Sequence, residues 1–197
     1  QNQRQLHVYT MKKIKAMKNS KILLMVAAGI TAGLLLSSCG ASIPKKATAV
    51  KPFKENRYLG TWYEIARLPM KFEKNLNNVS ATYTAYSDGS LKVENKGYNY
   101  KKNKWAEVKG KAKFIGPRDE ARLKVSFFGP FYSGYNVIAI TDDYQEALVA
   151  GDNLKYLWIL SRSTSISQST KDKFLAEAKR IGYDTDNLIW VEHTKDQ

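Results

Sequence analysis

Cysteine and histidine are scarce in this sequence of 197 residues, which contains one cysteine and two histidines. A single cysteine cannot form a disulfide within its own chain. With so few of these side chains, neither a cluster of metal ligands nor a Ser-His-Asp arrangement can be assembled. The composition therefore argues against the common metal-dependent and nucleophilic enzymes, and we expect a protein with no catalytic residues, no metal and no cofactor.

Acidic residues are absent from the first 38 positions, where five lysines lie between residues 12 and 21. Residues 22–36 then form an apolar run that only Thr31 interrupts, and small residues follow it. This order is typical of a secretory signal peptide. The run is shorter than the roughly 20 residues that a membrane-spanning helix needs. Residues 1–10 precede the first methionine and are interpreted as upstream sequence, which leaves Met11 or Met17 as the start.

The only cysteine, Cys39, lies at the end of this run in the sequence LSSC. These four residues resemble the lipobox of bacterial lipoproteins, in which the cysteine is lipidated and becomes the first mature residue. The alternative is an ordinary signal peptide with an incidental cysteine. The resemblance implies that residues 1–38 are upstream sequence and signal peptide and that Cys39 carries a lipid anchor. Gly40 is not the aspartate that retains lipoproteins at the inner membrane, which favours the outer membrane of a Gram-negative envelope.

The chain is basic, with a formal net charge of +14. Part of the excess lies in the signal peptide and part in residues 39–56, which also contain Pro44 and Pro52. We interpret residues 39–56 as a lipidated tether, since a basic segment close to a membrane suits an anionic lipid surface. A lipid-anchored secreted domain rarely meets nucleic acid, so we expect no nucleic-acid partner. Residues 57–197 are long enough for one domain.

Short runs of alternating or apolar residues, bounded by turn residues, predict eight strands in this domain. The expected ranges are 61–67, 79–86, 91–100, 105–114, 121–128, 135–141, 146–150 and 156–163. A helix follows, for which Ser169 and Asp172 resemble a capping box and Gly182 gives the stop. Residues 187–192 predict a short ninth strand. Periodicity alone does not distinguish a barrel from a sandwich.

Four stretches of this domain resemble one protein family. They are RYLGTWYEIAR (57–67), VSFFGPFYSGYNVIAI (125–140), DDYQEALVAG (142–151) and YLWILSRS (156–163). They are similar to the bacterial outer-membrane lipocalins and their relative apolipoprotein D, and the likeness runs from Arg57 to the C-terminus. The resemblance implies an all-β fold: an eight-stranded antiparallel up-and-down barrel with one C-terminal helix and a short ninth strand.

The family pattern also implies five structural positions, which are Gly60, Trp62, Asp143, Tyr144 and Arg162. By resemblance, Arg162 lies across Trp62 at the closed end of the barrel and has a structural role rather than a ligand-binding one. A neighbouring acid, Asp142, leaves open which aspartate corresponds to the family position.

The positions that face a ligand cavity must be inferred from the alternation of side chains along each strand. The residues predicted to line it are Ala66, Tyr83, Val108, Ala112, Val125, Phe127 and Trp158. The same alternation places Glu64 on the side of Trp62. An inward Glu64 would either be paired or serve as a polar contact for a ligand, and the sequence leaves both open.

Two functions of different classes follow. The first is an outer-membrane-anchored lipocalin that binds fatty acids or lysophospholipids and stores or moves lipid for membrane maintenance. A mixture of alanines and aromatic side chains in the predicted interior favours this function, because it leaves room for an acyl chain. The second is a tethered, non-enzymatic interaction module whose barrel is filled by its own side chains. The sequence leaves open whether the domain forms a homodimer.

Overall fold

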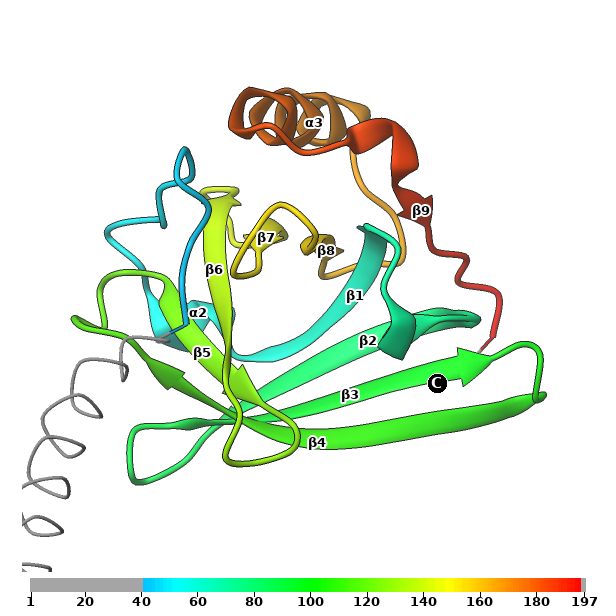
Figure 1. Ribbon diagram of the computed structural model, residues 1–197, viewed down its shortest axis with the longest axis horizontal. Coiled ribbons are helices and arrows are strands. Elements are labelled where there is room, and N and C mark those ends of the chain that lie inside the picture. The colour runs from blue at the N-terminus through cyan, green and yellow to red at the C-terminus, as the bar shows by residue number, and fades with distance from the viewer. Residues whose placement is uncertain (1–40, 196–197) are drawn as a thin grey trace, which may run out of the picture. The chain divides into compact units, whose positions relative to one another are not determined.

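The computed structural model describes residues 41–195, and these form one antiparallel barrel (Figure 1). The expected signal peptide, Cys39 and the two candidate start methionines lie outside the described residues. The strands are β1 (Gly60–Arg67), β2 (Leu76–Ala85), β3 (Leu91–Asn99), β4 (Lys104–Phe114), β5 (Arg122–Ser126), β6 (Ser133–Ile140), β7 (Glu146–Ala150), β8 (Leu157–Ser161) and β9 (Ile189–Trp190).

The strand order is β2-β3-β4-β5-β6-β7-β8-β1-β9, and an additional pairing between β1 and β2 closes the ring. Eight sequential strands joined in this way form an up-and-down barrel, while β9 adds to the edge of β1. The expected eight-stranded barrel is confirmed. Most strand bounds differ from the expected ranges by one to three residues, and β7 agrees at both ends.

A β-bulge interrupts β1 between Glu64 and Ala66, where the register against β8 shifts by one residue. Because one extra residue reverses the alternation of side chains, Trp62 lies in the cluster inside the barrel, whereas Ala66 lies in a second cluster outside it. The expectation that Ala66 faces the cavity is therefore wrong.

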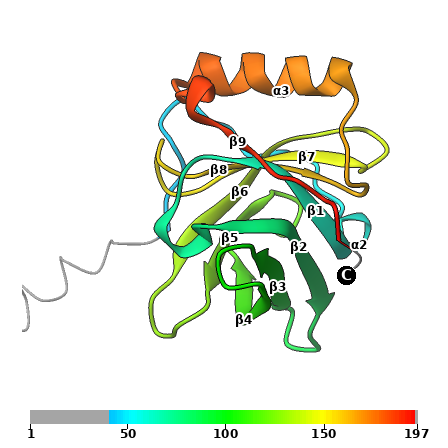
Figure 2. The same cartoon turned by 90° about the vertical axis from the view of Figure 1, so that its right-hand side faces the viewer.

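Helix α3 (Gln168–Ile181) lies on the outside of the barrel wall, above β7 and β8 (Figure 2). Its N-cap is Ser167, whose side chain accepts a hydrogen bond from the backbone N–H of Thr170 at 3.2 Å. The expected start at Ser169 is thus two residues late, because Ser167 satisfies a free N–H of the first turn. The helix ends as expected at Gly182, which has a φ of 114°.

The segment before β1 is part of the barrel domain rather than a free tether. Its backbone joins the sheet, since the N–H of Val50 donates to the carbonyl of Val137 and the N–H of Ala121 donates to the carbonyl of Val50. Phe53 and Tyr58, the latter in the short helix α2 (Glu55–Tyr58), are buried in the interior cluster. Apolar side chains at these positions gain from burial, so the domain includes residues 41–56, and the boundary expected at residue 57 is wrong.

Within residues 41–195, no helix is both long and apolar enough to cross a membrane. A short 3-10 helix, η1 (Lys71–Glu73), lies in the loop after β1, and a second, η2 (Thr185–Asn187), precedes β9.

Candidate functional site

The two ends of the barrel differ, and each is defined here by its loops. The closed end holds the start of β1, the end of β8 and the loops after β2, β4 and β6. The open end holds the loops after β1, β3, β5 and β7, because successive turns of an antiparallel meander alternate between the two ends.

A cavity of about 590 Å³ occupies the barrel and reaches the open end. Five of the residues expected to line a cavity do so, and these are Tyr83, Val108, Val125, Phe127 and Trp158. Ala112 belongs to the interior cluster but is not among the residues that line the cavity, so that expectation is wrong. Ala112 lies toward the closed end, where the interior side chains fill the barrel.

Three tyrosine hydroxyl groups meet where the cavity gives way to the filled part of the barrel. The hydroxyl of Tyr83 donates to that of Tyr135 at 2.8 Å, and the hydroxyls of Tyr58 and Tyr135 lie 2.6 Å apart. Burial raises the pKa of all three. The three hydroxyls therefore remain protonated and give the base of the cavity a neutral, hydrogen-bonded surface.

One wall of the cavity carries a buried cluster of charged side chains. Glu64 lines the cavity, and its carboxylate accepts a hydrogen bond of 2.5 Å from the guanidinium of Arg67. Arg67 also donates to the carbonyls of Glu73 and Leu76, each at 2.9 Å, so it fastens the loop after β1 to the barrel. Glu73 Oε2 lies 3.4 Å from Arg67 Nε, and Glu73 Oε1 lies 3.4 Å from the indole nitrogen of Trp158.

This cluster contains two carboxyl groups and a single guanidinium. Burial raises the pKa of Glu64 well above its usual value, and the neighbouring Glu73 raises it further. Burial also raises the pKa of Glu73. Of the two possibilities for Glu64, the structure shows the pairing, with Arg67, and it also places Glu64 in the lining of the cavity.

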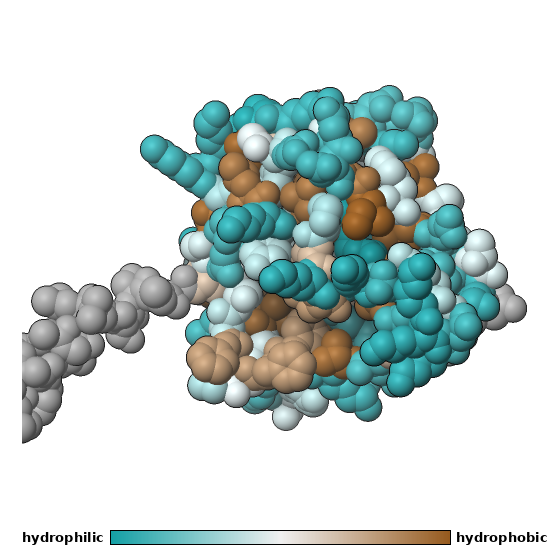
Figure 3. Space-filling view, turned by 45° about the vertical axis from the view of Figure 1, so that its right-hand side comes forward, coloured by the Kyte–Doolittle hydropathy of each residue, from teal (hydrophilic) through white to brown (hydrophobic). Residues whose placement is uncertain are grey.

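The mouth of the cavity is lined by exposed aromatic side chains. Phe72 comes from the loop after β1, and Phe128 and Phe131 come from the loop after β5; they are 66%, 78% and 81% exposed. Figure 3 shows a hollow in this side of the molecule with hydrophobic side chains at its edge. Monomeric soluble proteins rarely expose such side chains together.

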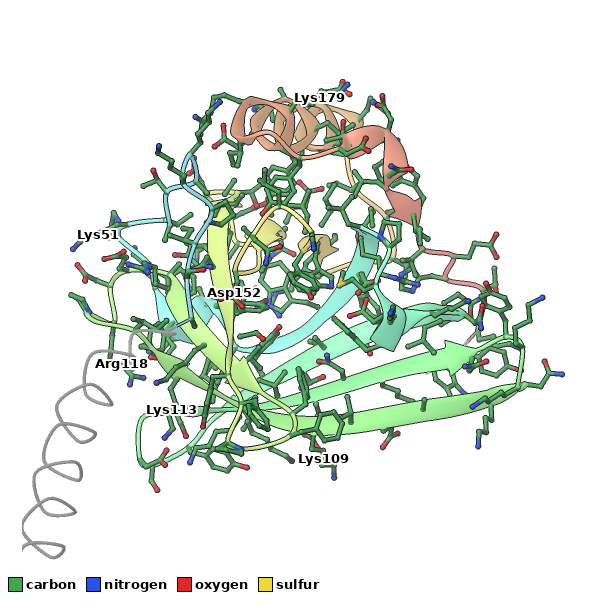
Figure 4. All side chains as sticks on the ribbon, viewed as in Figure 1. Lys51, Lys109, Lys113, Arg118, Asp152 and Lys179 are labelled. Atoms are coloured by element: carbon green, nitrogen blue, oxygen red, sulfur yellow. The ribbon has the colours of Figure 1, made fainter. Side chains whose placement is uncertain are left out.

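Asp152, which is labelled in Figure 4, belongs to the loop after β7 and also lines the mouth. Its carboxylate accepts hydrogen bonds of 2.7 Å from the backbone N–H groups of Ser42 and Gly134. The start of the described chain is therefore fixed beside the opening of the cavity.

The closed end is held by Arg162, whose guanidinium carbon lies 3.9 Å from the centre of the Trp62 ring. The guanidinium donates hydrogen bonds to the carbonyls of Thr61, Arg57 and Leu59 at 2.6, 2.8 and 2.7 Å. Gly60 has a φ of +91°, a backbone angle that residues with a side chain rarely adopt. None of these residues lines the cavity.

The turn after β6 also lies at the closed end. Asp143 accepts hydrogen bonds from the hydroxyl of Thr141 at 2.6 Å and from the N–H of Gln145 at 3.2 Å. Of the two neighbouring aspartates, Asp143 is therefore the one that organises the turn. Tyr144 is buried, and its hydroxyl accepts a hydrogen bond from the N–H of Lys54 at 2.8 Å.

A second hollow, of about 810 Å³, lies outside the barrel between the loop after β1 and the segment around β9. Its lining includes Lys71, Lys74 and Glu192, and it is more polar than the barrel cavity. It is less suited to an apolar ligand. Among the described residues no group of three or more His, Cys, Asp or Glu side chains could hold a metal ion.

Sequence reasoning missed several residues of the site. Tyr135 could have been found, because it alternates with the buried Val137 along β6. Arg67 lies beyond the bulge in β1, where the simple alternation fails. Phe72 and Glu73 lie in a loop, where no periodicity indicates the direction of a side chain.

Three comparisons place this site among known proteins. Residues 53–193 match the model of the "Lipocalin-like domain" family. The chain is 50% identical over 171 residues to "Outer membrane lipoprotein Blc" of Citrobacter freundii, covering 86% of this chain and 97% of the relative. It is 32% identical over 150 residues to "Apolipoprotein D" of Rattus norvegicus, covering 71% of this chain and 78% of the relative.

Among solved structures, insecticyanin from the tobacco hornworm Manduca sexta superposes with a TM-score of 0.63, covering 79% of this chain and 89% of that one. At 20% identity this likeness supports the fold alone. The family model, the identities and the open barrel cavity agree with one another, and the chain belongs to the lipocalins, a family of non-enzymatic proteins that bind small hydrophobic ligands.

Proposed function

We propose that the protein binds a single-chain lipid, a fatty acid or a lysophospholipid, and stores or carries it in the maintenance of the outer membrane. The observation that carries the proposal is the apolar cavity of about 590 Å³ inside the barrel. This volume lies within the roughly 300–1,000 Å³ typical of small-molecule sites. Relatives at about 50% identity are outer membrane lipoproteins, and the chain belongs to the outer membrane with them.

The lining of the cavity favours a slim apolar chain. Small residues such as Ala81, Gly97 and Ala106 lie beside the aromatic side chains of Tyr83 and Trp158. Each buried methylene group contributes about 0.8 kcal/mol to binding, so an acyl chain gains along its whole length. The headgroup of such a lipid would remain at the mouth, near the polar groups of the open end.

The membrane attachment rests on Cys39, which we propose to be lipidated after removal of residues 1–38. The described chain begins only two residues after Cys39, and Ser42 is already hydrogen-bonded to the domain. Mass spectrometry of the mature N-terminus tests this step. An unmodified thiol, or a first residue other than Cys39, would refute it.

The decisive experiment for the ligand is calorimetry with a Cys39→Ser variant from which bound lipid has been extracted. We expect saturable binding of a lysophospholipid and of a fatty acid of equal chain length, and weaker binding of a rigid ring compound. Because Trp158 lines the cavity, its fluorescence should change on binding. Failure of both single-chain lipids to bind would contradict the proposal and favour the alternative of a tethered interaction module.

A further inference from the structure

The exposed large hydrophobic side chains are concentrated at the open end. Eight such residues are found within residues 41–195, and five of them lie in the open-end loops: Phe72, Tyr100, Phe128, Phe131 and Leu154. Only Tyr86 lies in a closed-end loop, and the other two, Ile189 and Trp190, belong to β9. Exposed apolar patches of this kind mark surfaces that contact a membrane, a ligand or another protein.

Charge is divided between the ends in the same way. The open-end loops and the adjoining start of β4 carry six exposed lysines: Lys71, Lys74, Lys101, Lys102, Lys104 and Lys155. None of them forms an ion pair with another residue in the described part of the chain. The two acids of these loops, Glu73 and Asp152, are engaged with Arg67 and with the backbone of Ser42.

In the part of the chain that the structure describes, the closed end lacks such an excess of unpaired lysines. Its loops contain one basic residue, Arg118, and five acidic residues, which are Asp88, Asp119, Glu120, Asp142 and Asp143. Neighbouring cations contact these loops, so the two signs of charge are close to balance there. Lys51 pairs with Asp119 and Arg118 pairs with Glu55, and both of these basic residues are labelled on the left side of Figure 4. The end that opens the cavity is therefore the end suited to an anionic surface.

The path of the chain brings the expected anchor to the same place. Ser42 is held at the mouth by three contacts: its N–H and hydroxyl donate to Asp152, and its carbonyl accepts a hydrogen bond from Asn136 at 2.9 Å. Cys39 precedes Ser42 by three residues. An extended chain spans at most about 3.6 Å per residue, so a lipid on Cys39 would enter the bilayer within about 11 Å of the mouth.

We propose that the open end of the barrel docks on the bilayer that holds the Cys39 anchor. Phe72, Phe128 and Phe131 insert among the headgroups, and the six lysines contact lipid phosphates. This proposal rests on the lipidation of Cys39 described above. It adds an orientation and a docking surface, so that a lipid passes between bilayer and cavity without exposing its acyl chain to water.

The test uses the full lipidated protein in vesicles of phosphatidylethanolamine and phosphatidylglycerol. Since an acylated Cys39 cannot be labelled, Phe131→Cys carries the only free thiol and takes an environment-sensitive fluorophore. Ser87→Cys, in the exposed closed-end turn, is the matched control. The vesicles also contain a two-chain phospholipid with a spin label near the glycerol backbone, because side chains docked at an interface enter by about 5–10 Å.

We expect the spin label to quench the fluorophore at position 131 several-fold more strongly than the one at position 87. Replacing Lys101 and Lys102 together by glutamate should reduce quenching at position 131. Lys173→Glu should leave it unchanged, because this exposed lysine lies in the first half of α3, whose start is hydrogen-bonded to Glu146 on the closed-end side of β7.

Equal quenching at positions 131 and 87 would overturn the proposal. Shielding of position 131 from water without quenching, increasing with protein density, would also overturn it and would assign the surface to a second copy of the chain. Neither readout depends on ligand binding. Mass spectrometry of the same sample reports the anchor, so that failure of lipidation is distinguished from failure of docking.

Discussion

The closed and open ends of this barrel are made from the same eight strands but differ in how far their aromatic side chains are covered. At the closed end, Arg162 satisfies three backbone carbonyls and covers Trp62, which has no exposed surface. At the open end, Phe128 and Phe131 are largely exposed at the mouth of a cavity. One end is filled by side chains, and the other opens into a cavity. Changes at the first should alter stability, and changes at the second should alter binding.

The largest effect is expected from Arg67. This buried arginine donates hydrogen bonds to a carboxyl group and to backbone carbonyls near the open end, much as Arg162 donates to carbonyls at the closed end. Arg67→Met should lower the free energy of unfolding by about 3–5 kcal/mol, because it leaves two carboxyl groups buried without their cation. Chemical denaturation measures the change. A triple variant that adds Glu64→Gln and Glu73→Gln should recover much of the loss. A triple variant as unstable as Arg67→Met would contradict the role given to charge.

Arg162→Ala should lower the free energy of unfolding by about 1–3 kcal/mol, through loss of the stacking on Trp62 and of the three hydrogen bonds. Lipid affinity should remain unchanged, since Arg162 does not line the cavity. Arg162→Lys should recover only part of the stability, because an ammonium group lacks the planar fork. Thermal melts and lipid titrations separate the two roles. Unchanged stability together with lost binding would reverse the assignment of the two ends.

Val108→Trp tests the open end by filling the cavity. A bulky side chain at this lining position should weaken lysophospholipid binding at least about tenfold, or roughly 1.4 kcal/mol, with a smaller effect on stability. Lys109→Trp is the matched control, since this neighbouring side chain is 67% exposed and points out of the barrel. Calorimetry compares the two variants. Equal affinities would show that the ligand does not enter the barrel.

Glu64→Gln should have the smallest effect at neutral pH and should change how stability depends on pH. The pKa of Glu64 is raised in the folded state, so its contribution to stability is complete below the ordinary carboxyl pKa and is lost as pH rises through the raised value. Glutamine does not titrate. Relative to the native protein, the variant should therefore gain stability as pH increases. Parallel pH profiles for the two proteins would contradict the raised pKa.

The fold was predictable because local patterns and turn residues agreed along most of the domain. The alternation that identified Tyr83 and Val125 as lining residues held wherever a strand was regular. It failed at Ala66, because no residue near Glu64, such as a glycine, indicates the bulge in β1. The proline-containing segment before β1 resembled a linker, yet Phe53 docks in the interior, which depends on a site that only the folded barrel supplies.

The charged cluster at Glu64 shows the same limit. The sequence placed Glu64 on the inner side of β1 and left its partner open. That partner, Arg67, is only three residues away, but it reaches Glu64 because the bulge turns the strand between them. The exposure of Phe128 and Phe131 had no sequence signal either, since the alternation of side chains that holds along a strand does not extend into a turn.

The second hydrophobic cluster, between the barrel wall and α3, contributes to the stability of the fold when the cavity is empty. Phe174, Ala178 and Ile181 of the helix pack there against Leu148 and Leu157 of the strands. This core lies outside the cavity, so its burial energy is the same whether or not a lipid is present. The stability of this part of the fold therefore does not depend on a ligand in the cavity. A barrel whose wall is supported from outside by a helix keeps all of this packing when its cavity is empty.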